Sequence, residues 1–210
     1  MDIKFFDGIA PKQIDKTVEK FCKTVKYGSV PKYVKVCPWS EAIINECVPN
    51  VNNYLKTNEG KVLTGWAVWL HPMCMIEAEF HVIYQDKNGV LIDITPHKGN
   101  PDKILFLEDN TIIYNGCQIN SIRKNISKSK LIDKFINNQN RVFEITNKGK
   151  LKHNNGEIRL PKENFKTLLL IQEENTAYLK EFYSTLKLKP NDSCICGSGL
   201  KFIDCCKYNI

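Results

Sequence analysis

Residues 61–96, "KVLTGWAVWLHPMCMIEAEFHVIYQDKNGVLIDITP", decide the fold. The segments 61–70, 76–85 and 90–95 are rich in β-branched and aromatic side chains, which is typical of strands. Residues 86–89, "DKNG", separate the last two segments and indicate a tight hairpin turn. The sequence therefore predicts an antiparallel sheet with a central hairpin.

The length of the hairpin loop decides which side chains share a face of that sheet. His81 lies on the same face of its strand as the glutamates two and four residues before it. A loop of two or four residues would put Asp93 on the face opposite His81. A loop of three residues, 87–89, with Gly89 in the left-handed conformation, pairs Ile83 with Asp93 and brings Asp93 diagonally within reach of His81. We expect the three-residue loop.

Helical patterns flank this sheet on both sides. Residues 11–28 carry a helical stripe of apolar side chains, and residues 37–60 predict two short helices, each with a proline in its first turn. The longest helical pattern covers residues 161–186, and further strands are expected at 104–109, 111–116 and 141–152. These elements predict an α+β fold, organised as an α+β body over 1–150, a helical connector over 151–189 and a small module over 190–210.

Composition and charge indicate the cellular compartment of the protein and the kinds of partner that it could bind. The chain has 210 residues, and no stretch approaches the roughly 20 apolar residues that cross a bilayer. Its first residues lack the pattern of a secretion signal, so we expect a cytoplasmic protein in which clustered cysteines bind metal or catalyse. Residues 98–152 hold 11 Lys and Arg against 5 Asp and Glu. This segment is a candidate contact for nucleic acid, although a solvated lysine-rich face is the preferred interpretation.

Four of the nine cysteines lie close together near the end of the chain, in "SCICGSGLKFIDCC". Thiolates are preferred ligands for zinc, and four of them complete a closed tetrahedral site. A module this short has little core of its own, so metal binding would supply much of its folding free energy. The pattern predicts a structural Zn²⁺ site formed by Cys194, Cys196, Cys205 and Cys206.

The same residues resemble the SEC-C motif, a small zinc module that ends the preprotein translocase ATPase and many otherwise unrelated proteins. The resemblance implies the same four zinc ligands, and Lys201 and Phe202 match its basic and aromatic pair. It also implies a role in recognising a protein or the ribosome. With four cysteines the site keeps no open coordination position, so we expect this module to bind and not to catalyse.

Chemistry is therefore expected in the hairpin. A histidine with a carboxylate on the next strand has the geometry of an oriented general base. Cys47 precedes a proline and a predicted helix start, where free amides and the helix dipole lower the pKa of a thiol. Cys37, before Pro38, has an equivalent claim. Either cysteine could be the nucleophile, and Cys47, His81 and Asp93 are the preferred catalytic set.

The order of cysteine, histidine on a strand and aspartate on the next strand resembles the papain-like and transglutaminase-like thiol hydrolases. The expected reaction of these residues is acyl transfer at an amide, ester or thioester, with Asn50 or Glu79 as a supporting group for the oxyanion or for the orientation of His81. The sequence thus favours a thiol acyl-transfer enzyme that its zinc module docks on a protein or ribosomal partner. The alternative is a non-catalytic adaptor that uses the zinc module and residues 98–152 to bind protein or RNA.

Overall fold

A computed structural model describes residues 8–153, 159–194 and 199–205 of the chain. It contains α-helices and a mixed sheet, which confirms the α+β class. Within these residues, no helix is both long enough and apolar enough to span a membrane. The chain divides into two compact units, which we call the sheet unit (Ile9–Leu70 and Glu77–Asn115) and the helical unit (Gly8, His71–Ile76 and the described residues from Gly116 onward).

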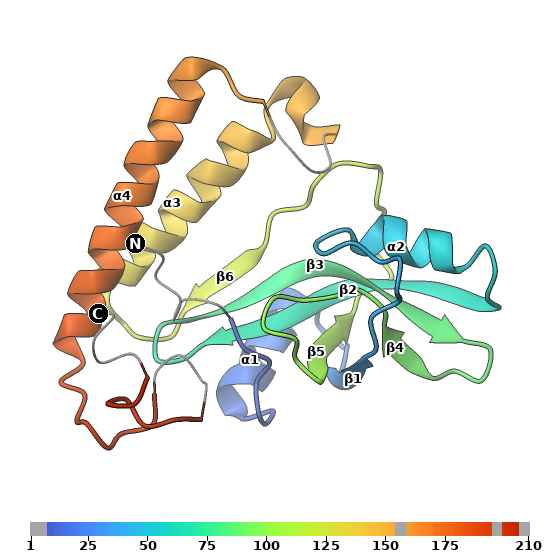
Figure 1. The fold of residues 1–210 in the computed structure, drawn as a ribbon, viewed down its shortest axis with the longest axis horizontal. Coiled ribbons are helices and arrows are strands. Elements are labelled where there is room, and N and C mark those ends of the chain that lie inside the picture. The colour runs from blue at the N-terminus through green and yellow to red at the C-terminus, as the bar shows by residue number, and fades with distance from the viewer. Residues whose placement is uncertain (1–7, 154–158, 195–198, 206–210) are drawn as a thin grey trace. The chain divides into compact units, whose positions relative to one another are not determined.

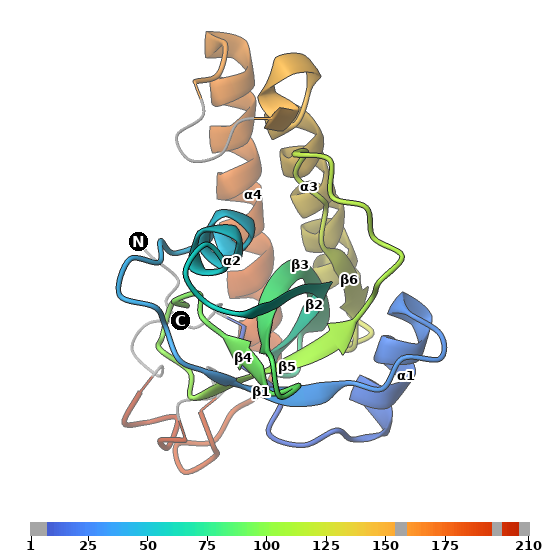
Figure 2. The same ribbon diagram turned by 90° about the vertical axis from the view of Figure 1, so that its right-hand side faces the viewer.

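The sheet unit is built on strands that close upon themselves. The strands are ordered β2-β5-β1-β4-β3, and β2 also pairs with β3 (Figures 1 and 2). The elements of this part of the chain are α1 (Lys16–Val25), β1 (Lys32–Val36), α2 (Cys47–Tyr54), β2 (Gly60–His71), β3 (Met75–Asp86), β4 (Leu91–Asp93) and β5 (Lys103–Glu108). β1 and β4 run parallel, with Val36 beside Asp93, so the sheet is mixed where an antiparallel one was expected.

The two faces of β3 are buried in different ways. Ile83 packs with apolar residues of β1, β2 and β5, namely Val34, Ala67, Ile104 and Phe106. Val82 and Tyr84, on the other face, pack with Val51 of α2 and with Ile94. Alternation along the strand therefore puts His81 on the same face as Ile83, at one end of that core.

Glycine permits a close approach between β2 and β5. Gly65 pairs with Glu108 in the antiparallel ladder. A Cβ atom at Gly65 would overlap the carbonyl oxygen of Leu107 and would lie 2.7 Å from the ring of Phe106. Any larger residue at this position would push the two strands apart, so the closed sheet requires glycine here.

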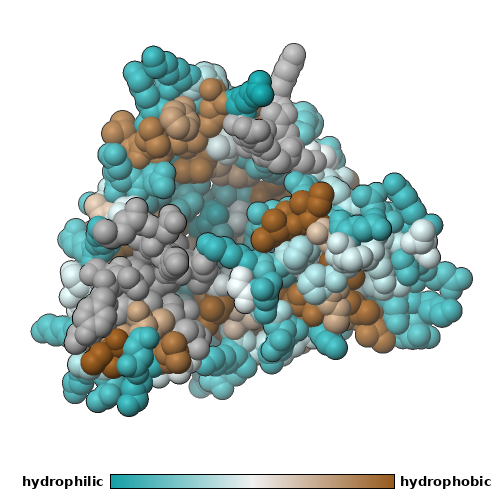
Figure 3. Space-filling view, in the orientation of Figure 1, coloured by the Kyte–Doolittle hydropathy of each residue, from teal (hydrophilic) through white to brown (hydrophobic). Residues whose placement is uncertain are grey.

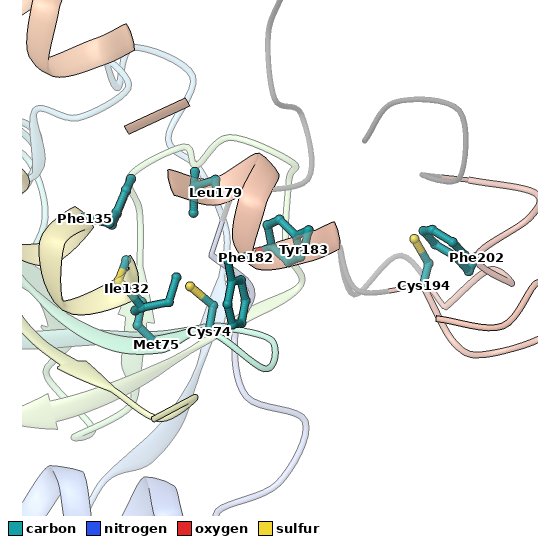
Figure 4. Packing of buried hydrophobic residues seen from close by; sticks show 9 residues of the cluster. All are labelled: Cys74, Met75, Ile132, Phe135, Leu179, Phe182, Tyr183, Cys194 and Phe202. Carbon is teal, nitrogen blue, oxygen red and sulfur yellow. The ribbon is translucent and has the colours of Figure 1, made fainter. Parts of the chain in front are cut away.

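Two long helices dominate the helical unit. Its elements are β6 (Ile122–Asn125), α3 (Lys130–Thr146), the 3₁₀ turn η2 (Gly149–His153) and α4 (Lys162–Thr185), and α3 and α4 lie side by side (Figure 1). Their shared core includes Ile132 and Phe135 of α3 and Leu179 and Phe182 of α4. Figure 4 shows these side chains gathered near Cys74, with Cys194 and Phe202 side by side in the tail.

The structure corrects four sequence-based expectations. Residues 37–46 form a loop, so the predicted pair of helices is reduced to α2. Residues 111–116 form no strand, and the strand expected at 141–152 is wrong because α3 and η2 occupy it. The segment β1 was not expected as a strand at all. By contrast, the long helix predicted over 161–186 is confirmed as α4.

Candidate functional site

The hairpin between β3 and β4 has the predicted loop. Asp86 donates its amide to the Val90 carbonyl at 3.0 Å, and Gly89 adopts a left-handed φ of 85°. Three residues, 87–89, therefore form the loop. Tyr84 pairs with Ile92, and the same register places Ile83 opposite Asp93. The expected register is confirmed, and it makes His81 and Asp93 diagonal neighbours on one face.

His81 and Asp93 form a buried hydrogen-bonded pair. The distance from Nε2 of His81 to Oδ2 of Asp93 is 2.9 Å, and the two residues are 5% and 0% exposed. Burial alone would lower the pKa of His81, but the charge and the hydrogen bond of Asp93 hold it well above its usual range. Burial alone would raise the pKa of Asp93, but His81 and a second histidine hold it below its usual value.

Cys47 completes this pair from a third element. It is the first residue of α2 and is half-buried. A hydrogen bond between Cys47 and His81 is a further cause of the raised pKa of the imidazole. Because Asp93 engages Nε2, the other ring nitrogen, Nδ1, is the one left for the thiol. The first-turn amides of a helix have no partner within the helix, so the start of α2 favours negative charge at this position.

The other described cysteines of the sheet unit are not placed in this way. Cys37 is exposed, and it follows β1, where its amide donates to the carbonyl of Asp93 at 2.8 Å. Cys22 is buried in the core of α1, and burial raises the pKa of its thiol to about 11. The structure therefore brings Cys47, and not Cys37, against His81.

Asn50 and Glu79 are engaged elsewhere. Oδ1 of Asn50 accepts from the Ile43 amide at 2.9 Å, and its Nδ2 donates to the Ile43 carbonyl at 2.7 Å. Asn50 thus fixes the loop that leads into α2. Glu79 accepts a hydrogen bond of 3.0 Å from Nε1 of Trp69.

A second histidine, His97, belongs to the cluster and was not anticipated. Its Nε2 lies 2.6 Å from Oδ2 of Asp93, and its ring centroid is 5.2 Å from that of His81. The only signal in the sequence is its spacing, four residues after Asp93 in "DITPH". That spacing brings two side chains together only if the chain turns directly after β4.

His81, Asp93 and His97 are also the described side chains that could hold a metal ion, since their ligand atoms lie within 4.8 Å of one another. A ring nitrogen must be deprotonated to bind a metal. Both Nε2 atoms lie at hydrogen-bonding distance from the same carboxylate oxygen, and each can donate a proton to it. The geometry is that of a hydrogen-bonded network.

The tail contains the second candidate site. Cys194 is 5% exposed and Cys205 is half-buried, and both pack around Phe202. The Cys194 amide donates to the Leu200 carbonyl, and the Cys205 amide donates to the Phe202 carbonyl. These contacts of the two described cysteines fit a metal-binding module. The other two predicted ligands, Cys196 and Cys206, lie outside the described residues.

Comparison with known proteins supports only the tail. The SEC-C motif matches residues 191–207, which supports a metal-binding module at this end of the chain. No curated protein matches the chain, and no solved structure does.

Proposed function

We propose that the sheet unit carries a thiol site for acyl transfer, with Cys47 as nucleophile, His81 as general base and Asp93 as the group that orients the imidazole. One observation carries this proposal: a cysteine at a helix start is hydrogen-bonded to a histidine whose other nitrogen is bound to a buried carboxylate. This is the arrangement that activates a thiol and keeps its proton close by. The order of the three residues along the chain also resembles that of the papain-like and transglutaminase-like thiol hydrolases.

The chemistry follows from these contacts. His81 takes the proton of Cys47, and the sulfur attacks the carbonyl carbon of an amide, ester or thioester. The amides of Cys47 and Val48, in the first turn of α2, are the available donors for the developing oxyanion. His81 then gives its proton to the leaving group as the bond to it breaks, and a thioester forms on Cys47. Water or another acceptor, deprotonated by His81, takes the acyl group and frees the thiol.

Alkylation by iodoacetamide, followed cysteine by cysteine with mass spectrometry, tests this proposal. At pH 7 we expect Cys47 to react about tenfold or more faster than Cys37, because only Cys47 has an imidazole partner. Cys37 is the matched control, since it is more exposed than Cys47 and belongs to the same unit. His81→Ala should remove the difference, and buried Cys22 should stay unlabelled.

An acyl donor tests the chemistry directly. p-Nitrophenyl acetate should acetylate Cys47 in the native protein, and a digest should locate the acetyl group there. Cys47→Ser should abolish this label. If Cys47 reacts no faster than Cys37 with either reagent, the site is not an activated thiol.

We also propose that the metal of the tail is Zn²⁺ and that the tail docks the protein on a protein or ribosomal partner. Four thiolates favour zinc and leave no position for substrate. Purified protein should contain one zinc per chain, and replacing Cys194 and Cys205 by serine should remove it. Protein without bound metal and with all four tail thiols free would contradict the assignment.

One observation favours the alternative, a non-catalytic adaptor. Phe165, Leu169 and Leu170 of α4 are all 45% exposed or more, and Figure 3 shows the hydrophobic surface that this end of α4 presents. An exposed apolar patch is typical of a protein-binding surface. Equal, slow alkylation of Cys37 and Cys47 would favour the adaptor over the enzyme.

A further inference from the structure

The three-residue site leaves the role of His97 unexplained. His97 is half-buried, and its side chain is aimed at Asp93 and not at solvent. Its contact with Asp93, at 2.6 Å, is shorter than that of His81 with the same oxygen, at 2.9 Å. A nucleophile, a base and an orienting carboxylate do not require a second imidazole.

We propose that His97 is a positioning residue of the thiol site, which acts on Cys47 through Asp93 and His81. It donates its Nε2 proton to Oδ2 of Asp93 and so holds the carboxylate in the orientation that His81 requires. This inference rests on the proposed function, because it matters only if Cys47 is an activated thiol.

Both oxygens of Asp93 are fixed by groups other than His81. Oδ1 accepts from the Thr95 amide at 3.0 Å, and Oδ2 accepts from His97. An aspartate side chain can otherwise rotate its carboxylate, since that torsion has only broad minima. Two donors on two oxygens define the plane of the carboxylate before His81 binds to it. Loss of His97 would leave only the Thr95 amide to do so.

The surroundings of His97 suit a fixed donor. The edge of its ring meets Trp69, with ring centroids 5.4 Å apart, and Trp69 is itself held by Glu79. The Asn100 amide donates to the His97 carbonyl and closes the turn that follows. Trp69 packs against the His97 ring, and Asp93 is 0% exposed, so the hydrogen bond between His97 and Asp93 lies away from bulk water, which strengthens a hydrogen bond to a charged group.

Several elements contribute titratable side chains to the cluster of His81, Asp93 and His97. Cys47 faces it from α2, His81 from β3 and Asp93 from β4, and His97 follows β4. Glu79 is directed at Trp69. Because Cys47 and His81 are in contact, the pH profile of Cys47 alkylation reports on the two residues together.

The test compares His97→Ala with His97→Gln by alkylation of Cys47 between pH 6 and pH 10. A glutamine amide can donate to Asp93 from about the same place as Nε2, but it is a poor metal ligand. At pH 6 to 7 we expect Cys47 of the alanine variant to react about tenfold more slowly than in the native protein. This is the effect expected when one hydrogen bond to a charged group is lost. The glutamine variant should stay within about threefold, because it keeps that bond.

The shape of the pH profile separates positioning from damage to the fold. If the carboxylate of Asp93 is no longer held in place, His81 becomes a weaker base for the thiol, and alkylation slows only while the thiol depends on His81. Near pH 10 the thiol ionises without help, and the alanine variant should react as fast as the native protein. His153→Ala, in the helical unit, is the control and should leave the profile unchanged.

Two results would overturn the inference. The first is rapid alkylation of Cys47 in the native protein that the His97→Ala substitution does not slow. The other is a glutamine variant as slow as the alanine variant at neutral pH, which would indicate a metal ligand or a packing role. A native Cys47 that reacts no faster than Cys37 would instead overturn the proposed function itself, so the two failures are distinguishable.

Discussion

Two buried aspartates of the sheet unit, Asp93 and Asp109, differ in an instructive way. Asp93 is 0% exposed and Asp109 is 6% exposed. Each accepts several hydrogen bonds, and each has a pKa below its usual value. Burial and a lowered pKa therefore do not by themselves distinguish a functional carboxylate from a structural one.

The donors distinguish them. Asp109 accepts from Lys26 at 2.8 Å, from Nε1 of Trp66 at 3.2 Å and from the amide and hydroxyl of Thr111. None of these donors is an imidazole, the side chain that most often changes its charge near neutral pH. Asp93 accepts from two imidazoles, and one of them contacts a thiol. A carboxylate whose donors can titrate is placed to control a proton, and one whose donors cannot is placed to hold the fold.

Replacing Asp93 should have the largest effect on chemistry. Asp93→Asn removes the charge that raises the pKa of His81 and weakens its hydrogen bond, and we expect alkylation of Cys47 at pH 6 to slow by up to about a hundredfold, as expected when a hydrogen bond to a charged group is lost. The difference should shrink toward pH 10, where the thiol ionises alone. Mass spectrometry of the Cys47 peptide measures both rates. Unchanged reactivity would mean that Asp93 is as structural as Asp109.

Replacing Asp109 should instead affect stability. Burial alone would raise the pKa of Asp109, but hydrogen bonds from Lys26, Thr111 and Trp66 lower it to about 2 in the folded protein, against about 3.9 when unfolded. The ionised form of Asp109 therefore stabilises the fold above about pH 4. This contribution is lost as the pH falls from about 4 to 2. Asp109→Asn should lower the free energy of unfolding by about 1–2 kcal/mol at pH 7 and by much less near pH 2.

Urea unfolding followed by tryptophan fluorescence measures this effect, because all three tryptophans of the chain lie in the sheet unit. In folded Asp109→Asn protein, Cys47 should be alkylated at a rate within about twofold of the native rate. A change of this size is well below the tenfold change that corresponds to 1.4 kcal/mol. A large loss of Cys47 reactivity in this variant would remove the distinction between the two aspartates.

The sequence predicts the contact between His81 and Asp93 but not the whole cluster around them. Alternation along two strands and a three-residue loop suffice to bring His81 and Asp93 together, because both signals are local. His97 was missed because its contact depends on a turn after β4, which the Thr95 amide stabilises by bonding to Asp93. The sequence favoured Cys47 but left Cys37 open, since each cysteine precedes a proline and a predicted helix start, and the contact of Cys47 with His81 comes from the structure.

The errors in the fold have a similar origin. Residues 141–152 contain β-branched and aromatic side chains, and so indicated a strand. In the structure Ile132, Phe135 and Asn138 form one buried face of α3. α4 covers this face, so contacts distant in sequence outweigh the local preference. β1 has only five residues, and its partners β4 and β5 lie more than fifty residues away.

The smallest effect is expected at Lys26, and it tests whether the Asp109 cluster depends on its ion pair. Lys26 is partly exposed, so Lys26→Met should lower the free energy of unfolding by only about 0.5–1 kcal/mol at low salt, and by less in 1 M NaCl. Lys23→Met is the matched control, because Lys23 pairs with Glu19 on the same helix at a far more exposed position. Lys23→Met should lower the free energy of unfolding by less than about 0.5 kcal/mol.

Without Lys26 the pKa of Asp109 rises toward its usual value, and the acid-induced loss of stability should begin at a higher pH. If the two lysine variants behave alike, Trp66 and Thr111 are sufficient to hold Asp109, and neutral donors alone then stabilise the buried charge.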